Sequence, residues 1–171
     1  MAVLEILTIG HPTLARKAER VARIDPELVR LARDMVETMH RAPGIGLAAP
    51  QVDVSKRLIT VDLSVGENED DLIVLVNPEI VRQEGEAVFE EGCLSVPDIR
   101  EKVARPYRVT VRGLDLEGRE IEIEGEDMLA RVFCHEIDHL DGKLFTDRLS
   151  PLKKALLRKK LKKSGPSGPN L

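Results

Sequence analysis

The amino-acid sequence predicts an α+β fold, with antiparallel sheets packed around a central helix and a further helix at the carboxyl end. Segments with the alternating apolar pattern of strands fall in the middle of the chain, and segments with helical spacing lie on either side of them. Such segregation of strands and helices is typical of α+β domains with antiparallel sheet. At 171 residues and 42% hydrophobic composition, the chain is long enough to form one core that is stable without disulfides.

The first predicted helix runs from Pro26 to about Arg41. Asp25 precedes it as an amino-terminal cap, proline suits the first turn, and apolar residues then recur at helical spacing. The next segment, APGIGLAAPQ at 42–51, contains two glycines and two prolines, which exclude a regular helix and favour a loop or a sheet edge. Nucleotide binding is not expected there, because the segment lacks the glycine spacing and the lysine of a phosphate-binding loop.

Four segments in the middle of the chain predict strands. Residues 59–63 alternate between apolar and polar side chains, and LIVLVNP at 72–78 predicts a short buried strand that ends at its Asn-Pro pair. Residues 107–112 and 120–124 both alternate apolar with polar or charged side chains and are joined by the turn-forming sequence LDLEG. These two segments predict a hairpin with one face in water.

Helical spacing returns between about Glu126 and Gly142, so this segment predicts the central helix. It carries the sequence HEIDH, in which His135 and His139 lie one turn apart on the same face. Both imidazoles can therefore reach one metal ion, while Glu136 is rotated by about 100° around the axis and can reach a water molecule beside that ion. Two histidines do not complete a catalytic metal site, which usually takes three protein ligands.

The third ligand is expected from upstream of the HEIDH sequence. Phe145 stands where the metzincin pattern has its last histidine, and no glutamate follows Glu136. Cys134 points away from the face that the two histidines share, and we expect it to pack against the sheet. Cys93 lies in EEGCLSVPD, where glycine and proline predict an irregular, exposed bend that can present a thiolate. Cys93 is therefore the predicted third ligand, in a Cys/His/His set that leaves a fourth position for water.

Charge is distributed unevenly along the chain. The final predicted helix starts at Ser150 and Pro151, and seven of the 26 basic residues follow Ser150, whereas none of the 30 acidic residues does. We expect a body at 1–150, a basic helix at 151–163 and a disordered tail at 164–171. A basic helix of this kind is typical of contact with nucleic acid or another polyanion, the alternative being a merely solvated helix. Its predicted apolar strip consists of Leu152, Leu156, Leu157 and Leu161.

No stretch approaches the roughly 20 apolar residues of a membrane span, and the first residues lack the pattern of a secretion signal. We therefore expect a cytoplasmic protein without a membrane partner. In that reducing compartment the two cysteines, Cys93 and Cys134, are expected to stay unpaired.

Three segments, GIGLAAPQ at 44–51, EGCLS at 91–95 and HEIDH at 135–139, resemble the signature motifs of bacterial peptide deformylases in order and separation. The resemblance extends from HPTL at 11–14 to DGKLFTDRLS at 141–150. It implies that the body is a metallohydrolase domain that removes the formyl group from the N-terminal formylmethionine of newly made polypeptides and releases formate. It also implies that the basic helix is a ribosome-docking element.

In that family the cysteine of the second motif and both histidines of the third bind a ferrous ion, which matches Cys93, His135 and His139. Thiolate and imidazole ligands also accept Zn²⁺, Ni²⁺ or Co²⁺. The resemblance implies that Glu136 accepts the proton of water and delivers it to the departing amine. The donors that it implies for the tetrahedral oxyanion are the side-chain amide of Gln51 and the backbone N–H of Leu94.

The glycine-rich segment resembles the edge along which the family pairs an extended peptide as an added strand. The resemblance further implies an apolar pocket for the methionine side chain and two charged residues near the bound peptide. Two positions depart from the commoner family pattern: Cys134 replaces a glutamine, and Arg131 would place a cation at the pocket rim. The candidate substrate-binding residues are Gly44, Ile45, Gly46, Glu91, Arg100, Met128 and Val132.

Two other classes of protein could use the same helix. One is a zinc peptidase of another lineage, which would cleave internal peptide bonds. The other is a non-catalytic, metal-stabilised module that docks on RNA through its basic helix. A purely structural metal site needs neither a base nor an oxyanion donor, so Glu136 and Gln51 count against the second alternative.

Overall fold

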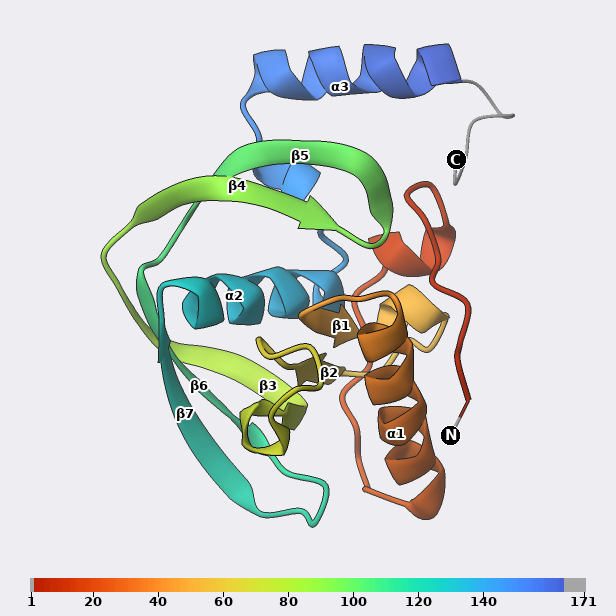
Figure 1. The fold of residues 1–171 in the computed structure, drawn as a ribbon, viewed down its shortest axis with the longest axis vertical. Helices are drawn as coiled ribbons and strands as arrows, with labels where there is room; N and C mark the ends of the chain where they lie inside the picture. Colours follow the sequence, from red (N-terminus) through yellow and green to blue (C-terminus); the bar gives the residue numbers. More distant parts are fainter. Residues whose placement is uncertain (1, 165–171) are drawn as a thin grey trace.

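The computed structural model describes residues 2–164. The predicted tail at 164–171 lies outside the described residues except for Ser164, where the last helix ends. The predicted α+β class is confirmed, because three α-helices and two antiparallel sheets form the fold (Figure 1). The helices are α1 (Pro26–Arg41), α2 (Met128–Leu140) and α3 (Pro151–Ser164).

The larger sheet has five strands in the order β1-β2-β3-β6-β7, and the smaller is a hairpin of β4 and β5. All neighbouring strands pair antiparallel. Strand β1 forms one edge of the larger sheet and lies next to β2 alone. The strands are β1 (Gly46–Ala48), β2 (Leu58–Val61), β3 (Ile73–Glu84), β4 (Ala87–Cys93), β5 (Val96–Arg105), β6 (Arg108–Leu114) and β7 (Glu120–Glu126).

Helix α2 lies at the centre of the molecule, between the larger sheet and the β4–β5 hairpin (Figure 1). Every residue from Ala130 to Leu140 is buried. Its apolar side chains, among them Phe133 and Ile137, belong to the core cluster that also contains residues of β2, β3 and β6. Its other face carries charged side chains that bond to the hairpin. The helix is therefore buried on both sides, by apolar packing on the sheet and by ion pairs on the hairpin.

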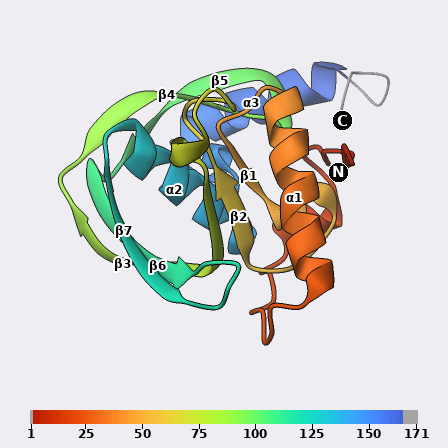
Figure 2. The same cartoon turned by 60° about the horizontal axis from the view of Figure 1, so that its bottom comes forward.

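Helix α1 has the predicted bounds. The Asp25 carboxylate accepts a hydrogen bond of 2.9 Å from the N–H of Leu28, which satisfies one of the free donors of the first turn. The buried face of α1 packs beside β1 and β2 (Figure 2). The carboxyl end of α1 is therefore held where the glycine-rich segment begins.

One strand prediction and one loop prediction were wrong. The predicted strand at 72–78 does not end at its Asn-Pro pair, because β3 continues to Glu84 through an irregularity between Val76 and Glu79. Asn77 adopts a positive φ of 53° there, and its side chain bonds to the backbone N–H and carbonyl of Val21. The predicted irregular bend at 90–98 is confined to the turn between β4 and β5, since both flanking segments are strands.

The apolar strip of α3 is divided between two environments. Leu157 and Leu161 pack against a third cluster of buried residues from β5 and the segment after α2, but Leu152 and Leu156 are 70% and 59% exposed. The strip was predicted as one surface, and only half of it covers the body. Among the described residues, no helix is long and apolar enough to cross a membrane.

Asp127, directly before α2, has a backbone conformation that favours glycine, with φ 57° and ψ −119°. Its side chain makes no capping hydrogen bond that would offset this strain. We expect Asp127→Gly to raise the melting temperature by roughly 2 to 4 °C, or about 1 kcal/mol. Asp127→Ala is the control, since it removes the carboxylate but keeps a Cβ. Equal melting temperatures of the glycine and alanine variants would refute the backbone strain.

Candidate metal centre and active site

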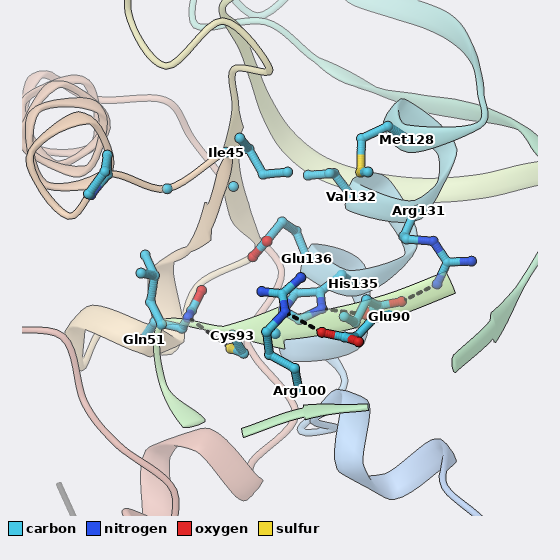
Figure 3. A pocket seen from close by; sticks show the side chains of 16 residues that line it. Ile45, Gln51, Glu90, Cys93, Arg100, Met128, Arg131, Val132, His135 and Glu136 are labelled. Carbon is cyan, nitrogen blue, oxygen red and sulfur yellow. Dashed lines mark hydrogen bonds and ion pairs between the residues drawn. The ribbon is translucent and has the colours of Figure 1, made fainter. Parts of the chain in front are cut away.

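A pocket with a volume of about 340 Å³ opens between the loop before β1, the turn between β4 and β5, and one face of α2. Figure 3 shows its lining side chains converging from these three elements. The three sequence segments that resembled family motifs supply most of the lining, although they lie far apart in the chain. The α2 helix contributes five side chains, which recur at the i, i+3 and i+4 positions of one helix face: Met128, Arg131, Val132, His135 and Glu136.

The structure brings the three predicted metal ligands together. One donor atom from each of Cys93, His135 and His139 lies within 4.8 Å of the others, and Cys93 Sγ is 3.4 Å from His139 Nε2. His135 Nδ1 is 2.8 Å from a Glu91 oxygen, which leaves Nε2 of that ring to face the cluster. Burial and the nearby His135 hold the pKa of His139 well below its usual value, so this imidazole is neutral. A cysteine sulfur and two imidazole nitrogens at this separation fit a transition-metal ion.

Glu136 lies beside the cluster and faces β1. Its side chain is buried, and burial raises its pKa to about 7. One carboxylate oxygen, Oε1, has no hydrogen-bond partner among the described residues. A Cβ added to Gly46 would meet Glu136 Oε2 and would approach Val132 Cγ1 to 2.8 Å. Glycine at 46 therefore allows β1 to pass directly over the carboxylate, which explains one glycine of the predicted loop.

Gln51 is fully buried and held in one orientation. The backbone N–H of Ala48 donates to Gln51 Oε1 at 2.9 Å, so the amide nitrogen must point the other way. That nitrogen donates to Ser95 Oγ at 3.1 Å and lies 3.7 Å from Cys93 Sγ. Leu94 lines the pocket at the same turn. The Gln51 amide thus presents a donor at the cluster.

Glu91 lines the pocket, but its carboxylate is already bonded on three sides. Arg105 donates to both oxygens at 2.9 Å, Arg131 donates at 2.6 Å, and the His135 ring is 2.8 Å away. Although burial opposes it, the bonds to His135 and Arg105 hold the pKa of Glu91 well below its usual value. Both oxygens are engaged in these bonds, so Glu91 orients His135. The expectation from the resemblance, that Glu91 lies near the bound peptide, stays a prediction.

The sequence led us to expect Arg131 as a cation at the pocket rim, but its side chain is buried in the structure. Arg131 is only 4% exposed, and its guanidinium bonds to the carbonyls of Ala87 and Val103 as well as to Glu91. It ties α2 to both strands of the hairpin. Cys134, by contrast, lies as predicted in the core against the sheet, and burial raises its pKa to about 11.

Sequence reasoning expected Asp138 to support the site or the structure, but it missed Arg105, which Asp138 bonds to. Arg105 donates to Asp138 at 2.6 Å and so links Glu91 to a second carboxylate, which Arg148 also holds. One signal was available, because the polar residues at 131, 135 and 138 follow helical spacing and mark a charged face on an otherwise apolar helix. Arg105 itself has no local pattern that would reveal its partner.

The other predicted substrate residues line the same pocket. Ile45, Met128 and Val132 gather at one side of it in Figure 3. Arg100 lies at the opposite side and pairs with Glu90 at 2.8 Å, with both side chains more than half exposed. A Cβ on Gly92 would come within 2.7 Å of Arg100 Nη1, so glycine there lets this guanidinium lie close over β4.

Comparison with known proteins identifies the family. The sequence profile of polypeptide deformylases matches residues 3–155. Peptide deformylase of Thermodesulfovibrio yellowstonii is 54% identical over 95% of this chain and 98% of its own length, and that of Acidobacterium capsulatum is 51% identical over 98% and 99%. The structure resembles a peptide deformylase crystal structure from Legionella pneumophila with a TM-score of 0.89, at 49% identity and 95% coverage of both chains.

A second solved structure adds a ligand to the comparison. The peptide deformylase from Synechococcus elongatus in complex with actinonin matches with a TM-score of 0.86 and 42% identity, over 92% of this chain and 88% of that one. These matches agree with the family that the three motifs resemble and with the fold observed here. The chain belongs to the polypeptide deformylase family and is therefore a metal-dependent hydrolase that removes formyl groups from polypeptides.

Proposed function

We propose that Cys93, His135 and His139 hold a ferrous ion with which this chain deformylates the N-terminal formylmethionine of new polypeptides. The observation that carries the proposal is the meeting of the Cys/His/His cluster, an unpartnered Glu136 oxygen and the Gln51 amide in one pocket. When bound, a divalent cation supplies a Lewis acid, which makes water nucleophilic near neutral pH. The same donor set accepts Zn²⁺, Ni²⁺ or Co²⁺, and iron is proposed from the family resemblance.

Glu136 transfers the proton, and Gln51 and Leu94 stabilise the negative charge that develops. Glu136 accepts a proton from the attacking water and returns it to the amine nitrogen, because an amide nitrogen leaves poorly unless it is protonated. As water oxygen bonds to the formyl carbon, negative charge gathers on the carbonyl oxygen. The Gln51 amide, fixed by Ala48, and the backbone N–H of Leu94 donate to that oxygen. The carbon–nitrogen bond then breaks, which releases formate and the free amino terminus.

The pocket also supports the choice of substrate. The edge of β1 and the preceding loop offer backbone groups to an extended peptide, and main-chain pairing tolerates many sequences. The methionine side chain enters between Ile45, Met128 and Val132. Arg100 at the rim meets the residues that follow methionine. Such an enzyme recognises the formyl group and the first side chain, and it accepts varied sequences after that residue.

Paired peptides test the substrate class. A formyl-methionyl tripeptide and its unformylated counterpart are incubated with the protein, and formate and cleaved fragments are both measured. We expect formate from the first peptide and no internal cleavage of either one. Internal cleavage would favour the zinc peptidase, and bound metal without any turnover would favour the non-catalytic module.

Docking on the ribosome through α3 is the second part of the proposal. The basic residues of α3 have no acidic neighbour in that helix, and the described part of α3 includes the exposed Arg158 and Lys159. Truncation after Ser150 is a poor test, because it also removes Leu157 and Leu161 from the third cluster. Substituting exposed charges keeps this packing intact.

We expect Arg158→Gln combined with Lys159→Gln to weaken co-sedimentation with ribosomes and to leave peptide turnover and the melting temperature unchanged. Two lost phosphate contacts should reduce the slope of log affinity against log salt by roughly 1.4 to 1.8. Arg41→Gln with Arg119→Gln is the matched control, since both are exposed cations on other elements. Equal salt dependence of the two double variants would refute docking through α3.

A further inference from the structure

A buried carboxylate lies directly after β2, outside the pocket and away from the metal centre. Asp62 is 1% exposed and accepts hydrogen bonds from four donors. Ser64 donates through its N–H at 2.9 Å and its hydroxyl at 2.7 Å, the N–H of Gly66 donates at 2.9 Å, and His40 Nε2 lies at 2.7 Å. Partners from a loop and from α1 thus converge on one carboxylate, and these bonds lower its pKa although burial opposes the shift.

The same residue is bonded to the wall of the pocket. The backbone N–H of Asp62 donates to the carbonyl of Ile45 at 2.9 Å, and the adjacent residues Gly46 and Val61 are paired in the β1–β2 ladder. At the other end of the loop, the N–H of Gly44 donates to the carbonyl of Met39 at 2.7 Å. The loop that leads into β1 is therefore held between the last turn of α1 and Asp62.

His40 links α1 to Asp62, because it belongs to the last turn of α1 and its ring bonds to the Asp62 carboxylate. Gly66 lies against the other side of that contact: an added Cβ would come within 3.3 Å of His40 Nδ1, and its φ of +89° favours glycine. Among the described residues, the His40 imidazole makes the only side-chain hydrogen bond between α1 and Asp62. Without it, α1 would hold the loop and β1 through the backbone bonds to its last turn and through apolar packing.

We propose that His40 is a positioning residue for the peptide-binding edge, acting through Asp62 on the carbonyl of Ile45. The proposal rests on the proposed function, in which the peptide pairs with residues 44–46. His40 lines no part of the pocket and touches neither the metal ligands nor Glu136. Its loss therefore loosens the surface on which the substrate lies and leaves the groups that react in place.

Three variants test the role. His40→Ala removes the bond to Asp62, His40→Gln restores a nitrogen donor at a similar reach, and Arg41→Ala is the neighbouring control, with an exposed pair to Glu37. We expect His40→Ala to raise KM for a formyl-methionyl tripeptide about tenfold while kcat stays within about twofold, since one bond to a charged group is lost. Metal content should not change, and His40→Gln should recover most of the KM. A fall in kcat with unchanged KM, or no rescue by glutamine, would overturn the proposal.

Hydrogen exchange tests the same role without a substrate. Backbone amides in residues 42–48 should exchange faster in His40→Ala than in Arg41→Ala or the unsubstituted protein. Equal exchange in this segment would overturn the positioning role even if the enzyme deformylates as proposed. Absence of formate from the unsubstituted protein would instead refute the proposed function, and the exchange result would still decide whether His40 fixes the loop.

Discussion

Replacing Glu136 by glutamine is expected to lower kcat by about 10²- to 10⁴-fold, while the protein keeps its metal. The amide occupies the same volume beside Gly46 but cannot accept the proton of the attacking water. Three side chains other than Glu136 form the Cys/His/His cluster, so metal content should match that of the unsubstituted protein. Steady-state formate release and metal analysis on the same preparation measure both quantities.

Glu122→Gln is the control for this substitution, because Glu122 is an exposed carboxylate on β7 and does not line the pocket. It makes the same chemical change without altering the active site. The Glu122 variant should retain full activity. Turnover of the Glu136 variant close to that of the control would remove Glu136 from the mechanism.

The second large effect is expected at the cysteines. Cys93→Ala should lower metal affinity by more than about 100-fold, because loss of a ligand costs more than the 10- to 100-fold seen for its outer partners. Cys134→Ala should retain the metal, since that thiol lies in the core and burial raises its pKa to about 11. Metal retention after dialysis against a chelator compares the two, and the reverse order would overturn the ligand assignment.

The sequence was most informative where a local pattern carries the structure. The cap at Asp25 and the apolar spacing after it give the bounds of α1, and the HEIDH spacing places His135 and His139 on one face of α2. Such features depend on neighbours within one or two turns of helix, so the chain near each residue is enough to predict them.

The features that were missed depend on residues distant in the chain. Asn77 and Pro78 favour the end of a strand, yet β3 continues past them through an irregularity, where the Asn77 side chain bonds to the backbone of Val21. Arg105 and Glu91 are 14 residues apart and meet across the β4–β5 hairpin. Their strands are rich in charged residues and lack clear alternation, because one face of the hairpin bonds to the polar face of α2. No local periodicity in the sequence indicates such a contact.

The peptide-binding edge was predicted from the sequence in part only. Glycines at 44 and 46 predicted an irregular edge, and the structure gives the reason at 46, where any side chain would collide with Glu136. The link from His40 through Asp62 to Ile45 joins three elements, and its members have no shared motif. Only the folded chain brings them together.

Formate release by the iron-loaded protein under anaerobic conditions tests the central claim most directly. A formyl-methionyl tripeptide is given to protein reconstituted with Fe²⁺, to the same protein reconstituted with Zn²⁺, and to metal-free protein. The account predicts one formate for each free amino terminus formed by the iron-loaded protein, and none from the metal-free protein. The zinc-loaded sample shows whether iron is specifically required. Equal formate production with and without metal, or none from the iron-loaded protein, would contradict the account.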